Sequence, residues 1–346
     1  MIALLPWHET PLRTLLAQRD RLSHALLLYG PRGIGKVEFA RALAQSMLCE
    51  SPENGIACGS CTACGWFAEG NHPDYREVQP TAQLDDETNN SDEIETAEKT
   101  SQEIVINQIR ELGDFIALST HRGGYRVLVL HPAETMNIAA ANALLKTLEE
   151  PPPHTLIVLV THQMGRLLAT IRSRCQRVML APPDQHTALA WLAAQNVPHP
   201  ELALAQFGGA PLAAREGADP ALQADREHLL TGLTNKPVDY IALADMLSKS
   251  LVKGKEHKML AQIMNWMQTW VYDLVAAKMA GQVRFHPDRR AAIEKLVAPL
   301  VVQKLLRFES ALRQMRRTIT HPLNSRLFLE QLLISYVEAT SHGTSD

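Results

Sequence analysis

The stretch "LLLYGPRGIGKVEFARALA", residues 26–44, joins an apolar segment to a helical one through a glycine-rich turn. The turn, residues 30–36, follows the phosphate-binding pattern G-x-x-x-x-G-K-[ST] as far as its lysine. In such a loop the backbone N–H groups surround phosphate oxygens, and the N-terminus of the next helix adds its dipole. At the last position, where a hydroxyl would hold Mg²⁺, the chain carries Val37. The stretch therefore predicts a strand, a phosphate loop and a helix, without the hydroxyl that binds the metal.

The chain around this loop alternates strand and helix patterns. Besides the apolar segment 26–29, short extended segments are predicted at 74–78, 126–130, 156–161 and 176–180. Helices are predicted at 38–44, 106–118 and 136–150, with a short one near Leu167. Strands that alternate with helices favour a mainly parallel sheet with helices on both faces. The first half of the chain is therefore predicted to be an α/β domain.

From residue 183 the strand patterns stop, and Ala/Leu-rich helical patterns run to the end. Breaks near residues 207–211 and 217–220 separate a short helical region from a longer one. We therefore predict an α/β domain over 1–182, a small helical lid domain over 183–217 and an all-helical C-terminal domain over 218–346.

Composition narrows the class of protein. The formal net charge of the 346 residues is −3, which argues against DNA binding by bulk electrostatics. No apolar run approaches the roughly 20 residues of a membrane span, and residues 1–8 lack the basic and apolar regions of a signal peptide. Four of the five cysteines are clustered, which suits a metal site in a reducing compartment better than a disulfide framework. We expect a cytoplasmic protein with no membrane partner.

The clustered cysteines lie in "LCESPENGIACGSCTACGW", residues 48–66. Two C-x-x-C steps share a cysteine and a fourth thiol precedes them, so the set offers four soft ligands to a tetrahedral ion, Cys49, Cys58, Cys61 and Cys64. Because no position is left for water, the spacing favours a structural Zn²⁺ site. Redox chemistry and a nucleic-acid-binding zinc finger are the alternatives. Cys175 stands apart and is predicted to be an ordinary buried thiol.

An acidic segment, "TAQLDDETNNSDEIETAEKTSQ", covers residues 81–102 and is almost free of large apolar groups. Such a stretch cannot bury enough surface to offset its ordering entropy. We interpret it as a solvated, disordered loop inserted between a strand and a helix. An acidic peptide that docks on a basic partner is the alternative.

The segment "RVLVLHPAETMNIAAANALLKTLEEPPPHTLIVLVTHQMGRLLATIRSRCQRVML", residues 126–180, resembles the AAA+ module of the clamp-loader family. The run "NALLKTLEEPP" followed by a strand and then "SRC" is specific to that group, and the similarity covers about residues 20–182. The cysteine insertion after the loop helix is shared with the bacterial members, in both their motor and delta-prime branches. The resemblance implies an α/β AAA+ module with a zinc-binding insertion.

The branch of the family is indicated by the residues that handle metal and water. The resemblance implies that in members that hydrolyse ATP the corresponding strand ends in Asp-Glu. Here the strand at 126–130 ends in His131-Pro132. Neutral imidazole is a poor ligand for a hard cation, and proline carries no base. Together with Val37, this predicts that the chain hydrolyses no ATP. For Gly30, Gly33, Gly35 and Lys36 two interpretations are open: a turn that merely needs glycine, or weak nucleotide binding through the lysine.

The tripeptide "SRC", residues 173–175, matches the family motif whose arginine reaches the γ-phosphate held by a neighbouring subunit. The resemblance therefore implies that Arg174 is an arginine finger in trans, a role suited to a planar, permanently charged, bidentate group. A generic basic face is the alternative, because other arginines lie nearby, at Arg166, Arg172 and Arg177. Thr161, at a strand end, matches the family's polar sensor position.

These features predict a member of the delta-prime branch, a non-hydrolysing, stator-like subunit of the DNA polymerase III holoenzyme. The resemblance implies that its partners are the motor (gamma/tau) and delta subunits, the sliding clamp and primed DNA. Its C-terminal helices would belong to an oligomeric collar. For an apolar stripe within 260–280 the resemblance favours packing against other subunits, and the chain's own helical core is the alternative. The alternatives are an active ATPase motor subunit and a stand-alone zinc-containing DNA-binding protein.

Overall fold

The computed structural model describes residues 4–81, 101–117, 120, 124–252, 256–319 and 324–341. The chain forms two compact units, Met1–Thr187 and Ala188–Asp346. Nearly all of the acidic segment predicted at 81–102 lies outside the described residues. The three-domain division of the chain stays a prediction.

The N-terminal unit is built on a five-stranded sheet in the order β2-β3-β4-β1-β5, and every neighbouring pair is parallel. Its strands are β1 (Ala25–Tyr29), β2 (Tyr75–Val78), β3 (Arg126–Leu130), β4 (Thr155–Thr161) and β5 (Gln176–Met179). Each predicted strand is confirmed to within one residue at either end. All residues of the central strands β3 and β4 are buried, as expected for strands covered on both faces.

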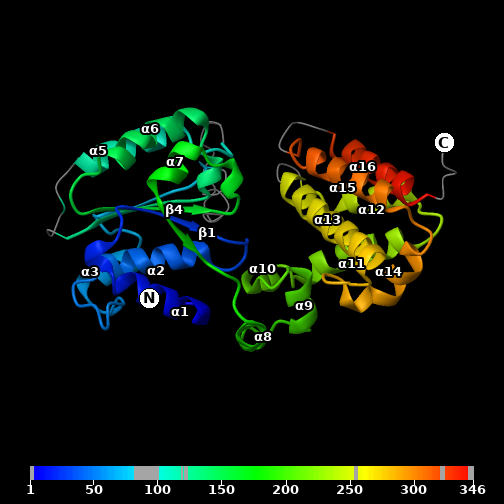
Figure 1. Cartoon of the computed structure of the whole chain (residues 1–346), viewed down its shortest axis with the longest axis horizontal. Coiled ribbons are helices and arrows are strands. Elements are labelled where there is room, and N and C mark those ends of the chain that lie inside the picture. Colours follow the sequence, from blue (N-terminus) through cyan, green and yellow to red (C-terminus); the bar gives the residue numbers. More distant parts are fainter. Residues whose placement is uncertain are drawn as a thin grey trace. The chain divides into compact units, whose positions relative to one another are not determined.

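Helices cover both faces of this sheet (Figure 1). One face carries α5 (Ile106–Ala117), α6 (Ile138–Glu149) and α7 (Ala169–Arg174), and the other carries α1 (Glu9–Leu16), α2 (Lys36–Leu48) and α3 (Thr62–Ala68). Helix α5 places Ile109, Leu112 and Ile116 in the core with α6 and the strands, at the i, i+3, i+7 spacing of one helix face. The α/β prediction for this half of the chain is confirmed.

Short 3₁₀ turns connect several of these elements. They are η1 (Pro6–His8), η2 (Arg19–Arg21), η3 (Ala133–Thr135), η4 (Met164–Arg166) and, in the second unit, η5 (Pro287–Arg289). Asn137 caps the start of α6, because its side chain accepts a hydrogen bond from the N–H of Ala140 at 2.8 Å. The cap fixes the start of the helix at Ile138, after the η3 turn that follows β3.

The second unit is helical throughout its described residues, with no strand among them. Its helices are α8 (Gln185–Ala194), which begins just before the boundary, α9 (Pro200–Gln206), α10 (Pro211–Glu216), α11 (Pro220–Thr234), α12 (Tyr240–Lys249), α13 (Glu256–Ala280), α14 (Arg290–Val297), α15 (Val302–Met315) and α16 (Ser325–Thr340). Among the described residues, no helix is long and apolar enough to span a membrane.

Helix α13 forms the centre of the larger core of this unit. Eight of its apolar side chains are at most 4 % exposed, namely Leu260, Ile263, Met264, Trp266, Met267, Trp270, Val271 and Leu274. They pack against residues of α11, α12 and α14 to α16. The prediction that this stripe packs against other subunits is therefore wrong, because the chain's own helices already cover it. A helix that is apolar around most of its circumference belongs to a core.

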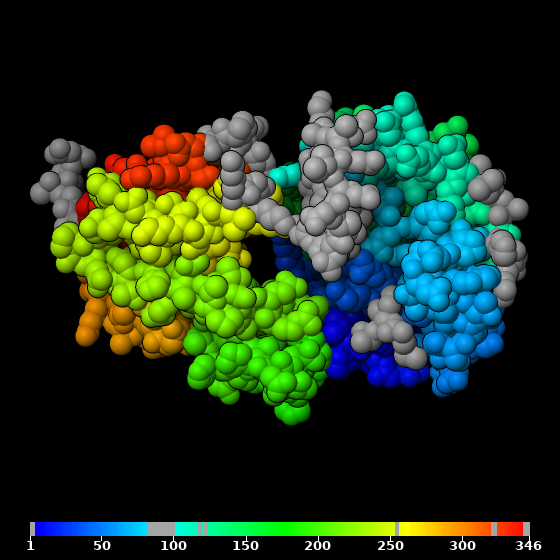
Figure 2. Space-filling model, turned by 180° about the vertical axis from the view of Figure 1, so that it is seen from behind, coloured from blue at the N-terminus to red at the C-terminus, as the bar shows by residue number. Residues whose placement is uncertain are grey.

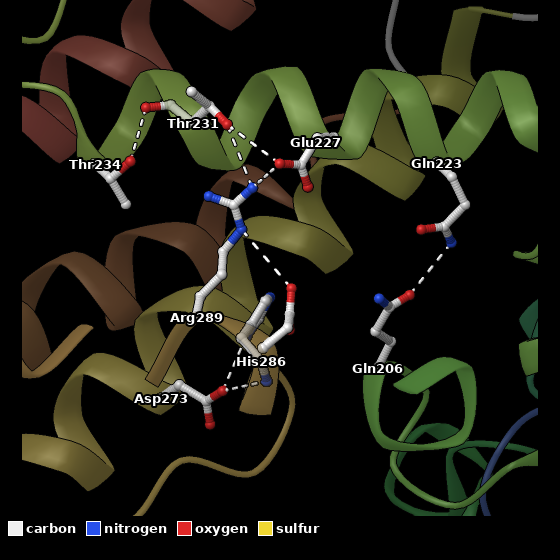
Figure 3. Close-up of polar contacts among 9 residues, drawn as sticks. Gln206, Gln223, Glu227, Thr231, Thr234, Asp273, His286 and Arg289 are labelled. Atoms are coloured by element: carbon white, nitrogen blue, oxygen red, sulfur yellow. Dashed lines mark hydrogen bonds and ion pairs between the residues drawn. The ribbon is translucent and has the colours of Figure 1, made fainter. Parts of the chain in front are cut away.

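Polar contacts join the helices at one side of this core (Figure 3). The fully buried Asp273 of α13 accepts hydrogen bonds from the backbone N–H groups of residues 284–286, at 2.8–2.9 Å, and from Nδ1 of His286 at 2.9 Å. Burial lowers the pKa of His286, although Asp273 opposes this change. Arg289 forms an ion pair with Glu227 of α11. These contacts fix the segment between α13 and α14 onto α11.

Candidate functional site

The glycine-rich loop turns tightly from β1 into α2. A Cβ atom on Gly30 would lie 2.2 Å from the carbonyl oxygen of Leu180, so no other residue fits there without movement of the backbone. Gly35, the N-cap of α2, has a φ of 84°, and Gly33 has a φ of 73°, both in the left-handed region that favours glycine. The turn alone therefore requires glycine at these positions, whether or not a phosphate binds.

Lys36 is engaged by the loop to which it belongs. Its Nζ donates hydrogen bonds to the carbonyl oxygen of Gly30 at 2.9 Å and to that of Pro31 at 2.5 Å. The residue is 3 % exposed, and burial lowers its pKa to about 8, against an opposing contribution from the charge of Glu134. The ammonium group that would meet phosphate oxygens is satisfied by carbonyl oxygens of its own loop.

The N-terminal segment contacts the loop from another direction. The carbonyl oxygen of Ile34 accepts a hydrogen bond from Nε1 of Trp7 and another from Nε2 of His8, each at 2.9 Å. Burial lowers the pKa of His8 to about 4, so its ring is neutral at pH 7 and carries its proton on Nε2. Two side chains from the η1 turn thus hold the tip of the loop.

His131 follows β3, at the position where the family resemblance implies an aspartate in members that hydrolyse ATP. It is buried, and its Nε2 donates to Oε1 of Glu77 on the neighbouring strand β2 at 2.6 Å. Glu77 also accepts from Nε of Arg41 and from the hydroxyl of Tyr75. Burial works to raise the pKa of Glu77, but the hydrogen bonds from His131 and Arg41, with the Arg41 charge, outweigh it and lower the pKa to about 2. His131 is therefore a hydrogen-bonded residue of this network.

Another carboxylate, which is buried, follows the same strand β3. Glu134, in η3 and 7 % exposed, accepts a hydrogen bond from Oγ1 of Thr161 at 2.8 Å and from the N–H of His162 at 3.1 Å. Thr161 pairs with Tyr29 in the sheet, so it lies beside the start of the glycine loop. Burial, with the charges of Lys36 and other groups, lowers the pKa of His162 to about 3. The predicted sensor residue is thus tied to a carboxylate of its own chain.

The positions that would handle metal and water are apolar or occupied in this arrangement. Val37 is half-buried and Pro132 is buried. Neither offers an oxygen ligand, and His131 donates its N–H to Glu77. Hard divalent cations require oxygen ligands. The geometry at these positions therefore fits a closed and internally satisfied loop better than a Mg²⁺–nucleotide site.

Arg174 is the last residue of α7 and lies apart from the glycine loop in the sequence. Its Nη2 forms an ion pair with Oε1 of Glu149, the last residue of α6, and its Nη1 donates to the carbonyl oxygen of Thr170 at 3.0 Å. The side chain is 35 % exposed. Of the other arginines in this region, Arg166 and Arg177 are exposed and Arg172 is half-buried. Arg174 is therefore both anchored and accessible.

The four clustered cysteines come together as their spacing predicts. Their sulfur atoms all lie within 4.8 Å of one another and form no disulfide. Cys49 follows α2, Cys61 is the N-cap of α3, and Cys64 lies in its first turn. Segment 49–72 forms part of the outer surface of the N-terminal unit (Figure 2, lighter blue).

The sulfur geometry fits a tetrahedral ion. A metal–sulfur bond of about 2.3 Å places tetrahedral sulfur ligands about 3.8 Å apart. The Sγ of Cys49 lies 3.6 Å from that of Cys58 and 3.8 Å from that of Cys61. Hydrogen bonds from the N–H groups of Ser60 and Cys61 lower the pKa of the Cys58 thiol to about 6, whereas burial raises the pKa of the Cys49 and Cys64 thiols. The cluster is able to hold a metal ion. Cys175 is buried on its own, as predicted.

Several residues at these sites were not singled out from the sequence. Glu77 and Glu134 accept the hydrogen bonds of His131 and Thr161, and Glu149 pairs with Arg174. Only the "LEEPP" motif gave any signal for one of them, since it contains Glu149. The other contacts depend on sheet order, which no local pattern contains.

Comparison with known proteins agrees with this arrangement. The family model described as "DNA polymerase III, delta subunit" matches residues 11–184, and "DNA polymerase III, delta subunit, C terminal" matches residues 220–338. The DNA polymerase III subunit delta′ of Pseudomonas aeruginosa is 32% identical over 351 residues, covering 99% of this chain and 100% of that protein.

Two further relatives extend the comparison. The subunit delta′ of Escherichia coli is 33% identical over 283 residues, covering 75% of this chain and 79% of that protein. The DNA polymerase III subunit tau of Bacillus subtilis is 33% identical over 166 residues, covering 48% of this chain and 26% of that protein. With a family model across half of the chain and a relative matched along its full length, this chain belongs to the DNA polymerase III subunit delta′ family.

Proposed function

We propose that this chain is a non-hydrolysing, stator-like subunit of the replicative clamp loader, acting in the cytoplasm. It helps load the sliding clamp onto primed DNA together with the motor (gamma/tau) and delta subunits. Its membership of the subunit delta′ family supports this assignment, as does its similarity to a tau subunit across about half of the chain.

The observation that carries the non-hydrolysing part is the internal bonding of the glycine loop. Lys36 donates to two carbonyl oxygens of its own loop, and His131 donates to Glu77. A nucleotide would have to displace the lysine contacts and would still find no oxygen ligand for Mg²⁺ at Val37, His131 or Pro132. Binding of ATP by this loop is therefore weak or absent. Any ATP that binds is not hydrolysed, because the groups that hold Mg²⁺ and activate water are missing.

The positive contribution of the chain to catalysis is assigned to Arg174. A guanidinium is planar, always charged and able to contact phosphate oxygens through two N–H groups. The side chain is 35 % exposed, so it is accessible to a neighbouring subunit. It is not part of the hydrophobic core of its own unit. We assign it the stabilisation of charge on the γ-phosphoryl oxygens of ATP bound by that neighbour.

The cysteine cluster is assigned a structural Zn²⁺ ion. All four sulfur atoms would be ligands, which leaves no coordination position for water. The ion would hold the loop between α2 and α3 in place of an extended apolar core. It takes part in no chemical step.

The C-terminal helices, from about residue 218, are assigned to the oligomeric collar. The surface available for this purpose is not the buried stripe of α13. Leu327 and Ile334 of α16 are 59 % and 38 % exposed and lie seven residues apart, on one face of the helix. Ile241, on the adjoining helix α12, is 51 % exposed. We propose that these exposed apolar side chains contribute to the surface that another subunit covers.

Co-purification tests the assignment. The tagged chain, mixed with the gamma and delta subunits, should elute with both at a fixed ratio over several columns. Elution of the chain alone would contradict membership of the complex. Phosphate release by the isolated chain would instead favour the motor-subunit alternative, and salt-sensitive binding of DNA by the isolated chain would favour the DNA-binding alternative.

A further inference from the structure

Arg174 is held by two groups of its own chain, and they come from different helices. The ion pair with Glu149 reaches across from the end of α6, whereas the carbonyl oxygen of Thr170 belongs to α7. The same carbonyl oxygen accepts the hydroxyl of Ser173 at 3.0 Å. The serine and the arginine of the "SRC" tripeptide therefore share one anchor, and the guanidinium has a second one in Glu149.

The helix that carries Glu149 is anchored in the core. The residue before it, Leu148, is 2 % exposed and lies in the core, together with Leu144 one turn earlier. Helices α6 and α7 pack against each other. The carboxylate at the end of α6 is thus carried by a rigid element and meets the guanidinium at the end of α7.

This anchoring leaves the guanidinium able to bind something else. Arginine has five N–H donors in a rigid fork, and the two anchors engage one donor on each terminal nitrogen. Enough donors remain for a two-point contact with phosphate oxygens. An arginine side chain free of such anchors would be spread over many rotamers, and only a fraction of them would present the fork correctly.

We propose that Glu149 is a positioning residue, which holds the guanidinium of Arg174 in the conformation that acts on a neighbour's nucleotide. The inference rests on the proposed role of Arg174 in trans. Glu149 touches no nucleotide, and its effect passes entirely through Arg174. Its neighbour Glu150 is a matched control, because it is also exposed and has no side-chain hydrogen bond or ion pair within the part of the chain that the structure describes.

The expected effect is modest and confined to turnover. An exposed ion pair of this kind changes the ratio between two side-chain conformations by about 1.5- to 5-fold. Loss of Glu149 should lower the kcat of the affected ATP site by a factor in this range, because a smaller fraction of Arg174 side chains is competent. The KM for ATP should not change, since the neighbouring subunit binds the nucleotide.

The test uses the clamp loader reconstituted with the full-length chain and measures clamp- and DNA-stimulated ATP turnover across ATP concentrations. The Arg174→Ala variant gives the full loss of ATP turnover at this site, against which the other variants are compared. Glu149→Ala should give part of that loss in kcat at unchanged KM, and Glu149→Gln should fall between it and wild type, because the amide keeps an acceptor. Glu150→Ala should match wild type. The double variant Glu149→Ala/Arg174→Ala should be no slower than Arg174→Ala alone, since both act through one group.

The outcomes separate the inference from the proposed function. If Arg174→Ala is slow but Glu149→Ala equals Glu150→Ala, or is faster than wild type, the positioning role is overturned and the role of Arg174 stands. A further loss in the double variant also overturns it, because Glu149 would then act on its own. If Arg174→Ala turns over at the wild-type rate, the proposed function fails first.

Discussion

His131, at the carboxyl end of β3, donates a hydrogen bond to Glu77 on the neighbouring strand β2, with 2.6 Å between Nε2 and Oε1. Arg41 of α2 binds the same carboxylate. The family resemblance places a metal-binding aspartate at this position in members that hydrolyse ATP. In this chain the position instead cross-links two strands and a helix. The polar groups at this end of β3 therefore serve the fold, as the proposed non-hydrolysing role requires.

The isolated chain should release no phosphate from ATP above background. Val37→Thr should not change this result, because the end of β3 would still lack both carboxylates. A malachite-green assay on rigorously purified protein checks it, with Lys36→Ala as the control for contaminating ATPase. Turnover by the wild-type chain that disappears in Lys36→Ala would contradict the account of the loop.

Replacement of Glu77 by glutamine should destabilise the N-terminal unit at neutral pH. The pKa of Glu77 is lowered from its ordinary 4.5 to about 2, so its ionised form stabilises the fold by about 3 kcal/mol. Because the folded pKa is the lower one, this stabilisation is complete above pH 4.5 and is lost as the pH falls from 4.5 towards 2.

Urea unfolding of wild type and Glu77→Gln at several pH values measures this dependence. The difference in unfolding free energy should be constant from pH 8 to pH 5 and should narrow below pH 4.5. Glu111→Gln, which removes an exposed carboxylate of the same unit, should show little difference at any pH. A Glu77→Gln difference that stayed the same down to pH 3 would show that its charge contributes nothing.

The purified chain should contain about one Zn²⁺ ion, because the four thiolates form a complete tetrahedral set. Cys61→Ser should lose the metal and about 3 kcal/mol or more of stability, since metal binding is coupled to folding of this segment. Cys175→Ser should keep the metal whatever its effect on stability. Metal analysis of protein purified without chelators decides the matter, and a wild-type chain free of metal would refute the zinc assignment.

Much of the N-terminal unit could be predicted from the sequence because its strands are short apolar runs with clear ends. The strand 126–130 was predicted without error, since Gly123-Gly124 and His131-Pro132 flank the apolar run at 127–130. Helices α1 and α3 were not predicted. Helix α3 has seven residues and begins at Cys61, whose sulfur accepts from the N–H of Cys64 in place of a conventional cap.

The polar contacts of the site were beyond prediction for a different reason. Glu77 meets His131 only because β2 pairs with β3 in a register that sets Val78 opposite Leu130. Glu134 meets Thr161 because η3 lies against the end of β4. The apolar stripe in α13 was assigned to subunit packing because of the family resemblance, yet a broad apolar stripe is also what a helix at the centre of a core requires.

The central claim is that this chain completes the ATP site of a neighbouring subunit through Arg174. The most direct measurement is clamp loading and stimulated ATP turnover by a reconstituted complex that carries Arg174→Ala, with Arg177→Ala as a control for a nearby exposed arginine.

Such a finger accelerates reaction at its site by about 10³- to 10⁵-fold. Because one site of several is affected, we expect a partial loss of total turnover, a larger loss of clamp loading, and normal assembly and zinc content. Arg177→Ala should behave as wild type. Wild-type turnover and clamp loading with Arg174→Ala would contradict the claim and leave Arg174 as part of a basic surface.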